Sequence, residues 1–71
     1  MIDKNMVEKY FVLMKSKGFI DSNWDFDCFV DDREYLKIYY LHKSGKRSSY
    51  RFLKERVLQD LREDILRQLL N

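Results

Sequence analysis

The period of the hydrophobic pattern changes twice along this chain of 71 residues. Apolar residues recur every three or four positions from residue 5 to 17, alternate with other residues from 24 to 42, and recur at helical spacing again from about 54 to 70. The first and last patterns predict amphipathic helices, and the middle one predicts strands with one buried face. A chain of this length makes one domain, so we expect a single small α+β domain over residues 1–71.

The first predicted helix carries its own boundary signals. Asn5 followed by Glu8 has the spacing of a capping box, which satisfies free N–H groups at a helix start. Gly18 followed by Phe19 is typical of a left-handed helix stop whose next residue packs back as an apolar clasp.

Two strands are predicted in the middle of the chain, and the match of their apolar faces decides how they pair. The expected buried residues of the first strand are Trp24, Phe26, Cys28 and Val30. A three-residue loop at 32–34 pairs Val30 with Leu36, whereas a two-residue loop places Lys37 beside Cys28 in the core. The apolar match favours the three-residue loop.

The stretch that follows the turn at residues 44–46 admits two interpretations. A three-residue loop there allows a short third strand over 47–52, which pairs Tyr40 with Tyr50. The alternative is a helix that starts already at residue 48 or 49, but its apolar stripe would have Lys54 at its centre. We favour the strand, because the last helix then starts near residue 54.

This order of elements predicts a two-layer αβββα domain, with two helices packed on one face of a three-stranded antiparallel sheet. The apolar stripe of the last helix consists of Leu53, Val57, Leu58, Leu61, Ile65 and Leu69, with Leu66 and Leu70 outside it. The other sheet face stays exposed and is expected to carry Phe29, Tyr35, Tyr39 and Leu41, the cations Lys37, Arg47 and Arg51, and the acids Asp25, Asp27 and Asp31.

Charge is distributed unevenly, although the net charge is only +2. Residues 21–34 contain six acidic residues and one arginine, whereas residues 43–56 contain six cations and one glutamate. Such a separation attracts charged partners or drives self-association. A core this small often needs oligomerisation to be stable, so we also expect a homodimer.

The basic segment HKSGKRSSYRF, residues 42–52, is the main candidate for binding nucleic acid. It places cations at a glycine turn that leads toward a helix N-terminus, where free N–H groups favour phosphate. The candidate contacts are Lys43, Lys46, Arg47, Arg51, Lys54 and Arg56. Ordinary solvation of a hairpin explains the same cations. Our leading hypothesis is a non-enzymatic module that contacts backbone phosphates.

The alternative is a protein-interaction module, such as an accessory or inhibitor protein of a phage or mobile element. Its candidate interface residues are Phe29, Tyr35, Tyr39, Leu66 and Leu70, because contiguous apolar patches commonly bind protein. On the exposed sheet face, aspartates across from the tyrosines favour a protein over a nucleic-acid backbone. The chain contains no proline, alanine or threonine, which is compatible with a mobile-element origin.

The αβββα order, with HKSGKR followed by LREDILRQL, resembles in topology the double-stranded-RNA-binding domains and the small HicA-type toxins. The first resemblance implies phosphate contacts near the start of the second helix, which Lys46, Arg47 and Lys54 would supply. The second implies a catalytic histidine on a preceding strand. This chain has no histidine there, Lys37 being the nearest residue, so the resemblance does not imply ribonuclease activity.

No set of residues has the spacing of an active site or a metal site. His42, the only histidine, has no nucleophile and carboxylate at a defining distance in sequence and is expected to be a strand-end residue bonded to backbone. Cys28 is expected on the apolar face as an inert thiol. Residues 21–32 imitate a calcium loop, but Phe26 stands at the glycine position and the final glutamate is missing. We therefore predict no catalytic residues, no metal and no cofactor.

Cysteine content and hydropathy indicate the compartment. A single cysteine cannot form an internal disulfide, and the chain has no run of about 20 apolar residues. The N-terminal residues carry acids and lysines instead of the apolar region of a signal peptide. These features predict a cytoplasmic protein without a membrane segment.

Overall fold

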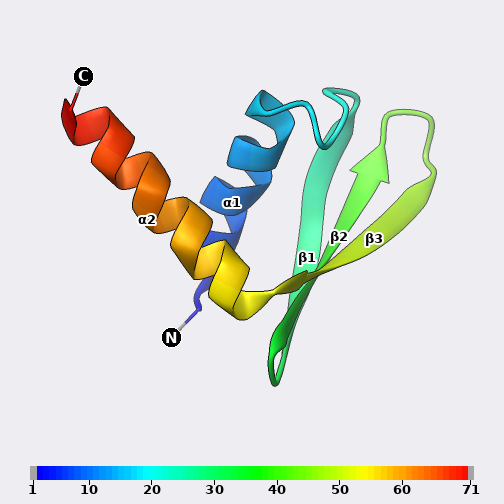
Figure 1. Ribbon diagram of the computed structural model, residues 1–71. Helices are drawn as coiled ribbons and strands as arrows, with labels where there is room; N and C mark the ends of the chain where they lie inside the picture. Colours follow the sequence, from blue (N-terminus) through cyan, green and yellow to red (C-terminus); the bar gives the residue numbers. More distant parts are fainter. Residues whose placement is uncertain (1, 71) are drawn as a thin grey trace.

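A computed structural model describes residues 2–70 and contains two helices and three strands (Figure 1). In chain order they are α1 (Lys4–Ser16), β1 (Trp24–Asp32), β2 (Tyr35–His42), β3 (Arg47–Leu53) and α2 (Lys54–Leu70). The strands form one antiparallel sheet in the order β1-β2-β3. The predicted αβββα order is confirmed, including the third strand and the start of the last helix at residue 54. Within residues 2–70, neither helix is long and apolar enough to span a membrane.

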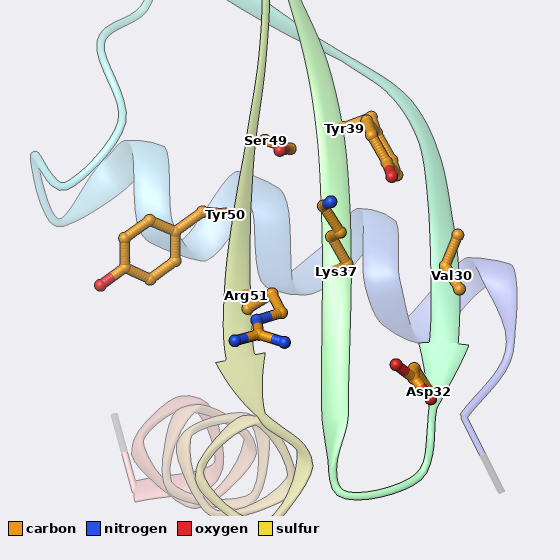
Figure 2. A pocket seen from close by; sticks show the side chains of 7 residues that line it. All are labelled: Val30, Asp32, Lys37, Tyr39, Ser49, Tyr50 and Arg51. Atoms are coloured by element: carbon orange, nitrogen blue, oxygen red, sulfur yellow. The ribbon is translucent and has the colours of Figure 1, made fainter.

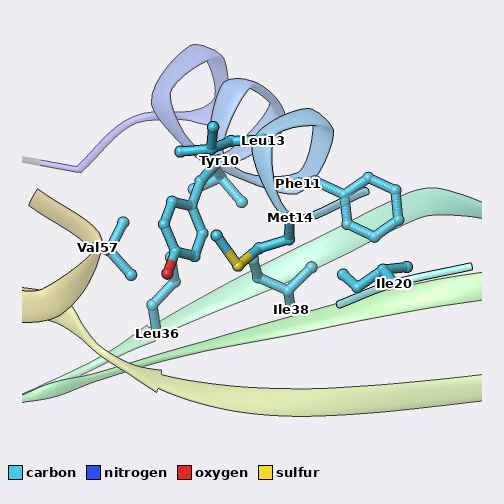
Figure 3. Packing of buried hydrophobic residues seen from close by; sticks show 9 residues of the cluster. Tyr10, Phe11, Leu13, Met14, Ile20, Leu36, Ile38 and Val57 are labelled. Atoms are coloured by element: carbon cyan, nitrogen blue, oxygen red, sulfur yellow. The ribbon is translucent and has the colours of Figure 1, made fainter. Parts of the chain in front are cut away.

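The core lies between α1 and the sheet (Figure 3). Its buried residues are Val7, Tyr10, Phe11, Leu13, Met14, Ile20, Leu36, Ile38 and Val57. Leu36 and Ile38 come from the central strand and are fully buried, and complete burial of such a side chain stabilises a fold by about 1.5 to 3 kcal/mol. The central strand and α1 therefore supply most of the buried core.

Both ends of α1 follow local chemistry. The N-cap is Asp3, whose carboxylate accepts a hydrogen bond from the Met6 N–H at 3.0 Å. The predicted cap at Asn5 is wrong, because an aspartate two residues earlier already satisfies the first turn. At the other end Gly18 has φ of 83°, as a left-handed stop requires. The expected clasp by Phe19 is also wrong: Phe19 is exposed, and Ile20 enters the core instead.

The pairing of β1 with β2 differs from the prediction. The strands are joined by a two-residue turn, Arg33-Glu34, in which Arg33 has φ of 52°. A β-bulge between Phe26 and Cys28 leaves one extra residue, Asp27, without an opposite partner. After the bulge the strand presents its other residues to the core, so the second half of β1 has the opposite alternation from the one expected.

The bulge changes which residues are buried. Phe29 lies opposite Ile38 and packs against the core, whereas Val30 lies opposite Lys37 and is 46% exposed. Cys28 is exposed as well. The predicted burial of Cys28 and Val30, and the predicted exposure of Phe29, are therefore wrong.

The second hairpin has a three-residue loop, as predicted, but the loop spans 43–45 instead of 44–46. The His42 N–H donates to the Lys46 carbonyl at 2.7 Å and closes it. Gly45, with φ of 94°, occupies the last loop position, where such loops require a left-handed residue. Consequently Tyr50 lies opposite Ile38 and not Tyr40. The register of β3 against β2 is thus shifted by two residues from the predicted one. Because side chains alternate with a period of two, each still lies on its predicted face.

The last helix is covered only near its start. Of its residues only Val57 and Asp60 are buried, and Figure 1 shows its C-terminal half running away from the sheet. The predicted stripe therefore lies largely in solvent: Leu58, Ile65 and Leu69 are all exposed. Leu66 and Leu70, predicted to lie outside the stripe, are exposed too.

Candidate nucleic-acid interface

The sheet face opposite α1 is not covered by any described element, and Figure 2 looks onto it. Strand alternation and register place the following residues on it: Asp25, Cys28, Val30 and Asp32 from β1, Tyr35, Lys37, Tyr39 and Leu41 from β2, and Arg47, Ser49, Arg51 and Leu53 from β3. We call this surface the open face. Most of its expected members are present, but Phe29 and Asp31 are not, because the bulge turns both toward the helix side.

Cations lie over tyrosine rings at the centre of the open face. The guanidinium carbon of Arg51 is 4.9 Å from the ring centroid of Tyr35, and Lys37 Nζ is 5.1 Å from that of Tyr39. Both distances are in the range of cation–π attraction, which orients the cation against the ring. Val30, Lys37, Tyr39, Ser49 and Arg51 line a shallow hollow here, with Asp32 and Tyr50 at its margin (Figure 2).

Lys37 and Arg51 are direct cross-strand neighbours. Like charges in opposite positions of two strands repel each other. Within residues 2–70, neither cation lies within 4 Å of a carboxylate oxygen. The centre of the open face is thus a place where an anion would relieve repulsion.

The acids near this face lie on β1 and are partly neutralised. Arg47 Nη2 donates to Asp27 Oδ2 at 2.8 Å, an ion pair that the bulged position of Asp27 makes possible. Lys15 from α1 reaches around the sheet edge to within 4.0 Å of Asp25. Charge on the open face is therefore graded, from acidic at the outer strand β1 to basic at β2 and β3.

The six cations expected to bind phosphate do not form one cluster. Lys43 and Lys46 are exposed in the β2–β3 loop, close to Arg47 at the start of β3. Lys54 and Arg56 lie beyond the other end of that strand, about 20 Å away at the usual rise per residue. The structure brings Lys37 to the group instead, a residue that the sequence placed on this face but not among the phosphate contacts.

The two distant cations have internal partners. Lys54 forms an ion pair with Asp31, and Arg56 Nε lies 3.3 Å from Asp60 Oδ1. The Tyr10 hydroxyl donates to the other oxygen of Asp60 at 2.8 Å. Burial, and then the hydrogen bond to Asp60, raise the pKa of Tyr10 above its ordinary range. The buried pair of Tyr10 and Asp60 joins α2 to α1, and no spacing in the sequence indicated it.

The residues expected to form a protein interface are divided between three places. Tyr35 and Tyr39 are on the open face, Phe29 packs against the core, and Leu66 and Leu70 are on α2. Beside them a groove runs between α1 and α2, lined in its apolar part by Met6, Val12, Leu13, Leu61 and Ile65. The α2 residues and this groove are therefore a surface separate from the open face.

His42 and Cys28 have local environments only. His42 Nδ1 accepts the Ser44 N–H at 3.1 Å and lies 2.8 Å from Ser44 Oγ, so it stabilises the loop 43–45, and its ring packs edge-on against Trp24. Cys28 is on the open face. In the part of the chain that the structure describes, no three His, Cys, Asp or Glu side chains are placed to hold a metal ion.

Small two-layer folds of helices and a sheet serve many functions, so the arrangement of elements does not assign one. Function has to be argued from the open face and from the exposed part of α2. In comparisons with known proteins, the chain matches no family model, no curated protein and no solved structure.

Proposed function

We propose that this protein is a small, non-enzymatic nucleic-acid-binding module that holds a single strand on its open face. The observation that carries the proposal is the pair Lys37 and Arg51, which lie opposite each other, each over a tyrosine ring, and have no carboxylate partner among residues 2–70. Phosphates would neutralise the two cations. The tyrosine rings and the guanidinium plane of Arg51 would stack bases, each stack contributing about 1 to 3 kcal/mol.

The loop extends this surface. Lys43 and Lys46 are exposed in the loop that precedes Arg47, at the end of the sheet where β3 begins, so a strand that crosses β2 and β3 could continue along the loop. The bound strand would be unpaired, because bases in a duplex cannot reach the tyrosine rings. Lys54 and Arg56 are left out of the binding surface, since both are held in ion pairs beyond the end of β3.

The test is the affinity for labelled single-stranded and duplex oligonucleotides, measured by fluorescence anisotropy between about 50 and 200 mM salt. We expect saturable binding that favours single strands. In the double variant Lys37→Gln/Arg51→Gln, binding should weaken and the slope of log affinity against log salt should fall by about 1.4, because each phosphate contact to a single strand contributes about 0.7.

The matched control is Arg62→Gln/Arg67→Gln, which removes the same charge from the exposed surface of α2. It should keep the affinity and the salt slope of the unmodified protein. An equal loss in both variants would show that only net charge matters, and absence of binding at 50 mM salt would disprove the proposal.

A second candidate function, protein interaction, is favoured by α2. Leu69 and Leu70 are 76% and 85% exposed, and Ile65 and Leu66 are more than half exposed. A contiguous apolar surface of this kind usually marks a binding site. We call Ile65, Leu66, Leu69 and Leu70 the apolar row. We propose that α2 docks this row into a groove on another protein, as amphipathic helices do.

Charge introduced into the apolar row tests this candidate. With the chain as bait, Leu66→Glu/Leu70→Glu should lose a crosslinked partner that the unmodified chain retains, while its stability changes by less than about 0.5 kcal/mol because both side chains are exposed. The control is Lys9→Gln/Lys17→Gln, which makes the same change in net charge at one residue of α1 and at the residue directly after the helix. This variant should retain the partner. Retention by the leucine variant would contradict this function.

A further inference from the structure

We propose that two copies of this chain pair antiparallel through the open edges of their β3 strands, with Tyr50 of each copy at the two-fold axis. The paired sheets would form one sheet of six strands. Such pairing involves backbone and side chains at the edge of β3 and does not depend on nucleic-acid binding. It follows from the contrast between the two sheet edges and from the register that β3 permits with itself.

The outer edge of β1 is protected against pairing with another strand. The bulge at Asp27 interrupts the regular ladder, and Lys15 Nζ donates to the Trp24 carbonyl at 2.8 Å, occupying an acceptor on that strand. Aspartates add repulsion along the same strand. Bulges and charges of this kind are the usual means by which proteins prevent edge pairing.

The outer edge of β3 has no bulge, and Arg47, one of its two charged residues, is paired with Asp27. The strand pairs with β2 over seven residues without a register shift and contains no proline. Figure 1 shows α2 leaving the C-terminal end of β3, with its C-terminal half running away from the sheet. Unpaired N–H and C=O groups on such an edge are a template for a further strand.

Two hydrogen bonds establish which backbone groups are free. The His42 N–H donates to the Lys46 carbonyl at 2.7 Å, and the Lys54 N–H donates to the Glu34 carbonyl at 2.8 Å. Because bonded and non-bonded pairs alternate in an antiparallel ladder, the residues of β3 bonded to β2 are Ser48, Tyr50 and Phe52. The residues that direct N–H and C=O to the free edge are Arg47, Ser49, Arg51 and Leu53.

Charge selects one register among those that pair most of the strand. A two-fold axis at Ser49 places Arg47 opposite Arg51 of the second copy. An axis at Arg51 places the Arg51 residues of the two copies opposite each other. Like charges in opposite positions are destabilising. An axis at Tyr50 pairs all seven residues of β3, with Arg51 opposite Ser49 and Arg47 opposite Leu53.

The side chain at this axis is suited to an interface. Tyr50 is 59% exposed, lies against Phe52 with ring centroids 4.8 Å apart, and extends beyond the edge of β3 (Figure 2). In the proposed register the two Tyr50 residues form a non-hydrogen-bonded pair, the arrangement in which opposite side chains are closest. Pairing would therefore bury an exposed aromatic ring together with the free backbone groups.

The dimer would also rearrange charge on the open face. The acidic strands β1 would become the two outer rims, and Lys37, Arg47 and Arg51 of both copies would lie in the four central strands. A basic centre flanked by acidic rims gives one continuous surface for an anionic strand. A monomer could still bind nucleic acid, and a dimer could form without binding it.

Cysteine crosslinking tests the register. In a Cys28→Ser background, Tyr50→Cys should form a disulfide-linked dimer under mild oxidation, because directly opposite non-bonded residues have Cα atoms about 4.5 Å apart, within disulfide reach. The control is Ser49→Cys. In the proposed register the two residues at position 49 are diagonal neighbours, about 7 to 8 Å apart, and should crosslink at least tenfold more slowly. Equal or inverted rates would overturn the proposed register.

A backbone variant tests the edge itself. Ser49→Pro removes an N–H directed to the free edge but none bonded to β2, so it should convert the dimer into a folded monomer in sedimentation velocity. Leu66→Glu/Leu70→Glu should remain dimeric. A monomer in the leucine variant would place the interface on α2, and a dimer unaffected by the proline would disprove pairing through β3.

Discussion

Replacing Phe29 with alanine should lower the free energy of unfolding by about 2 to 4 kcal/mol, within the range found when large apolar side chains are truncated in a core. Val30→Ala should cost less than about 1 kcal/mol, because Val30 faces solvent opposite Lys37. Phe29 packs against the core opposite Ile38. Urea denaturation of the two variants measures the contrast directly.

The same comparison tests the bulge at Asp27. If β1 had uniform alternation, Val30 would point into the core and Phe29 to the open face, and the order of the two effects would be reversed. The m-value should stay constant in both variants, since neither changes the surface exposed on unfolding by much. A larger loss for Val30→Ala would mean that the register of β1 has no bulge.

The helices, the strands and their order could be predicted because each rests on a period that the residues display locally. By contrast, the sequence could not predict which residues of β1 face the core after residue 26. Apolar residues at 28, 29 and 30 satisfy either phase, and the ion pair that the bulged Asp27 makes with Arg47 joins residues 20 positions apart. Alternation alone gives no information about such a contact.

The second hairpin shows the opposite case, in which a local rule is sufficient to fix the loop. A three-residue loop ends in a left-handed residue, and Gly45 is the only glycine in the segment. Placing Gly45 last gives the loop 43–45 and the observed pairing of Tyr50 with Ile38. Apolar matching alone allows a register shifted by two residues, because Tyr40 is as good an apolar partner for Tyr50 as Ile38 is.

The candidate site could be predicted in composition but not in extent. Arg47 and Arg51 were expected beside the tyrosines, and the register places them there. The separation of Lys54 and Arg56 from the loop depends on the length of β3 and on ion pairs with Asp31 and Asp60, which require the tertiary fold. The exposure of the α2 stripe has the same origin, since periodicity shows that a face is apolar but not that anything covers it.

The buried hydroxyl of Tyr10 leads to the last prediction. Tyr10→Phe should destabilise the protein by about 1.5 to 3 kcal/mol at pH 7, because the Asp60 carboxylate loses a charge-assisted hydrogen bond in a buried position. As Asp60 and Val57 are the only buried residues of α2 within residues 2–70, amide hydrogens of that helix should exchange faster in the variant. The control Tyr50→Phe alters an exposed hydroxyl and should change stability by less than about 0.5 kcal/mol.

High pH should remove this difference. Burial and the bond to Asp60 raise the pKa of Tyr10 in the folded protein, whereas the unfolded chain ionises near pH 10. The folded state therefore holds a proton that the unfolded state releases, and the stability from the neutral hydroxyl is complete below pH 10 and lost as pH rises above it, by up to about 1.4 kcal/mol per pH unit. Tyr10→Phe lacks this component, so the stabilities of the two proteins should converge above pH 10. A constant difference between pH 9 and pH 11.5 would show that the hydroxyl is not held by Asp60 as a buried donor.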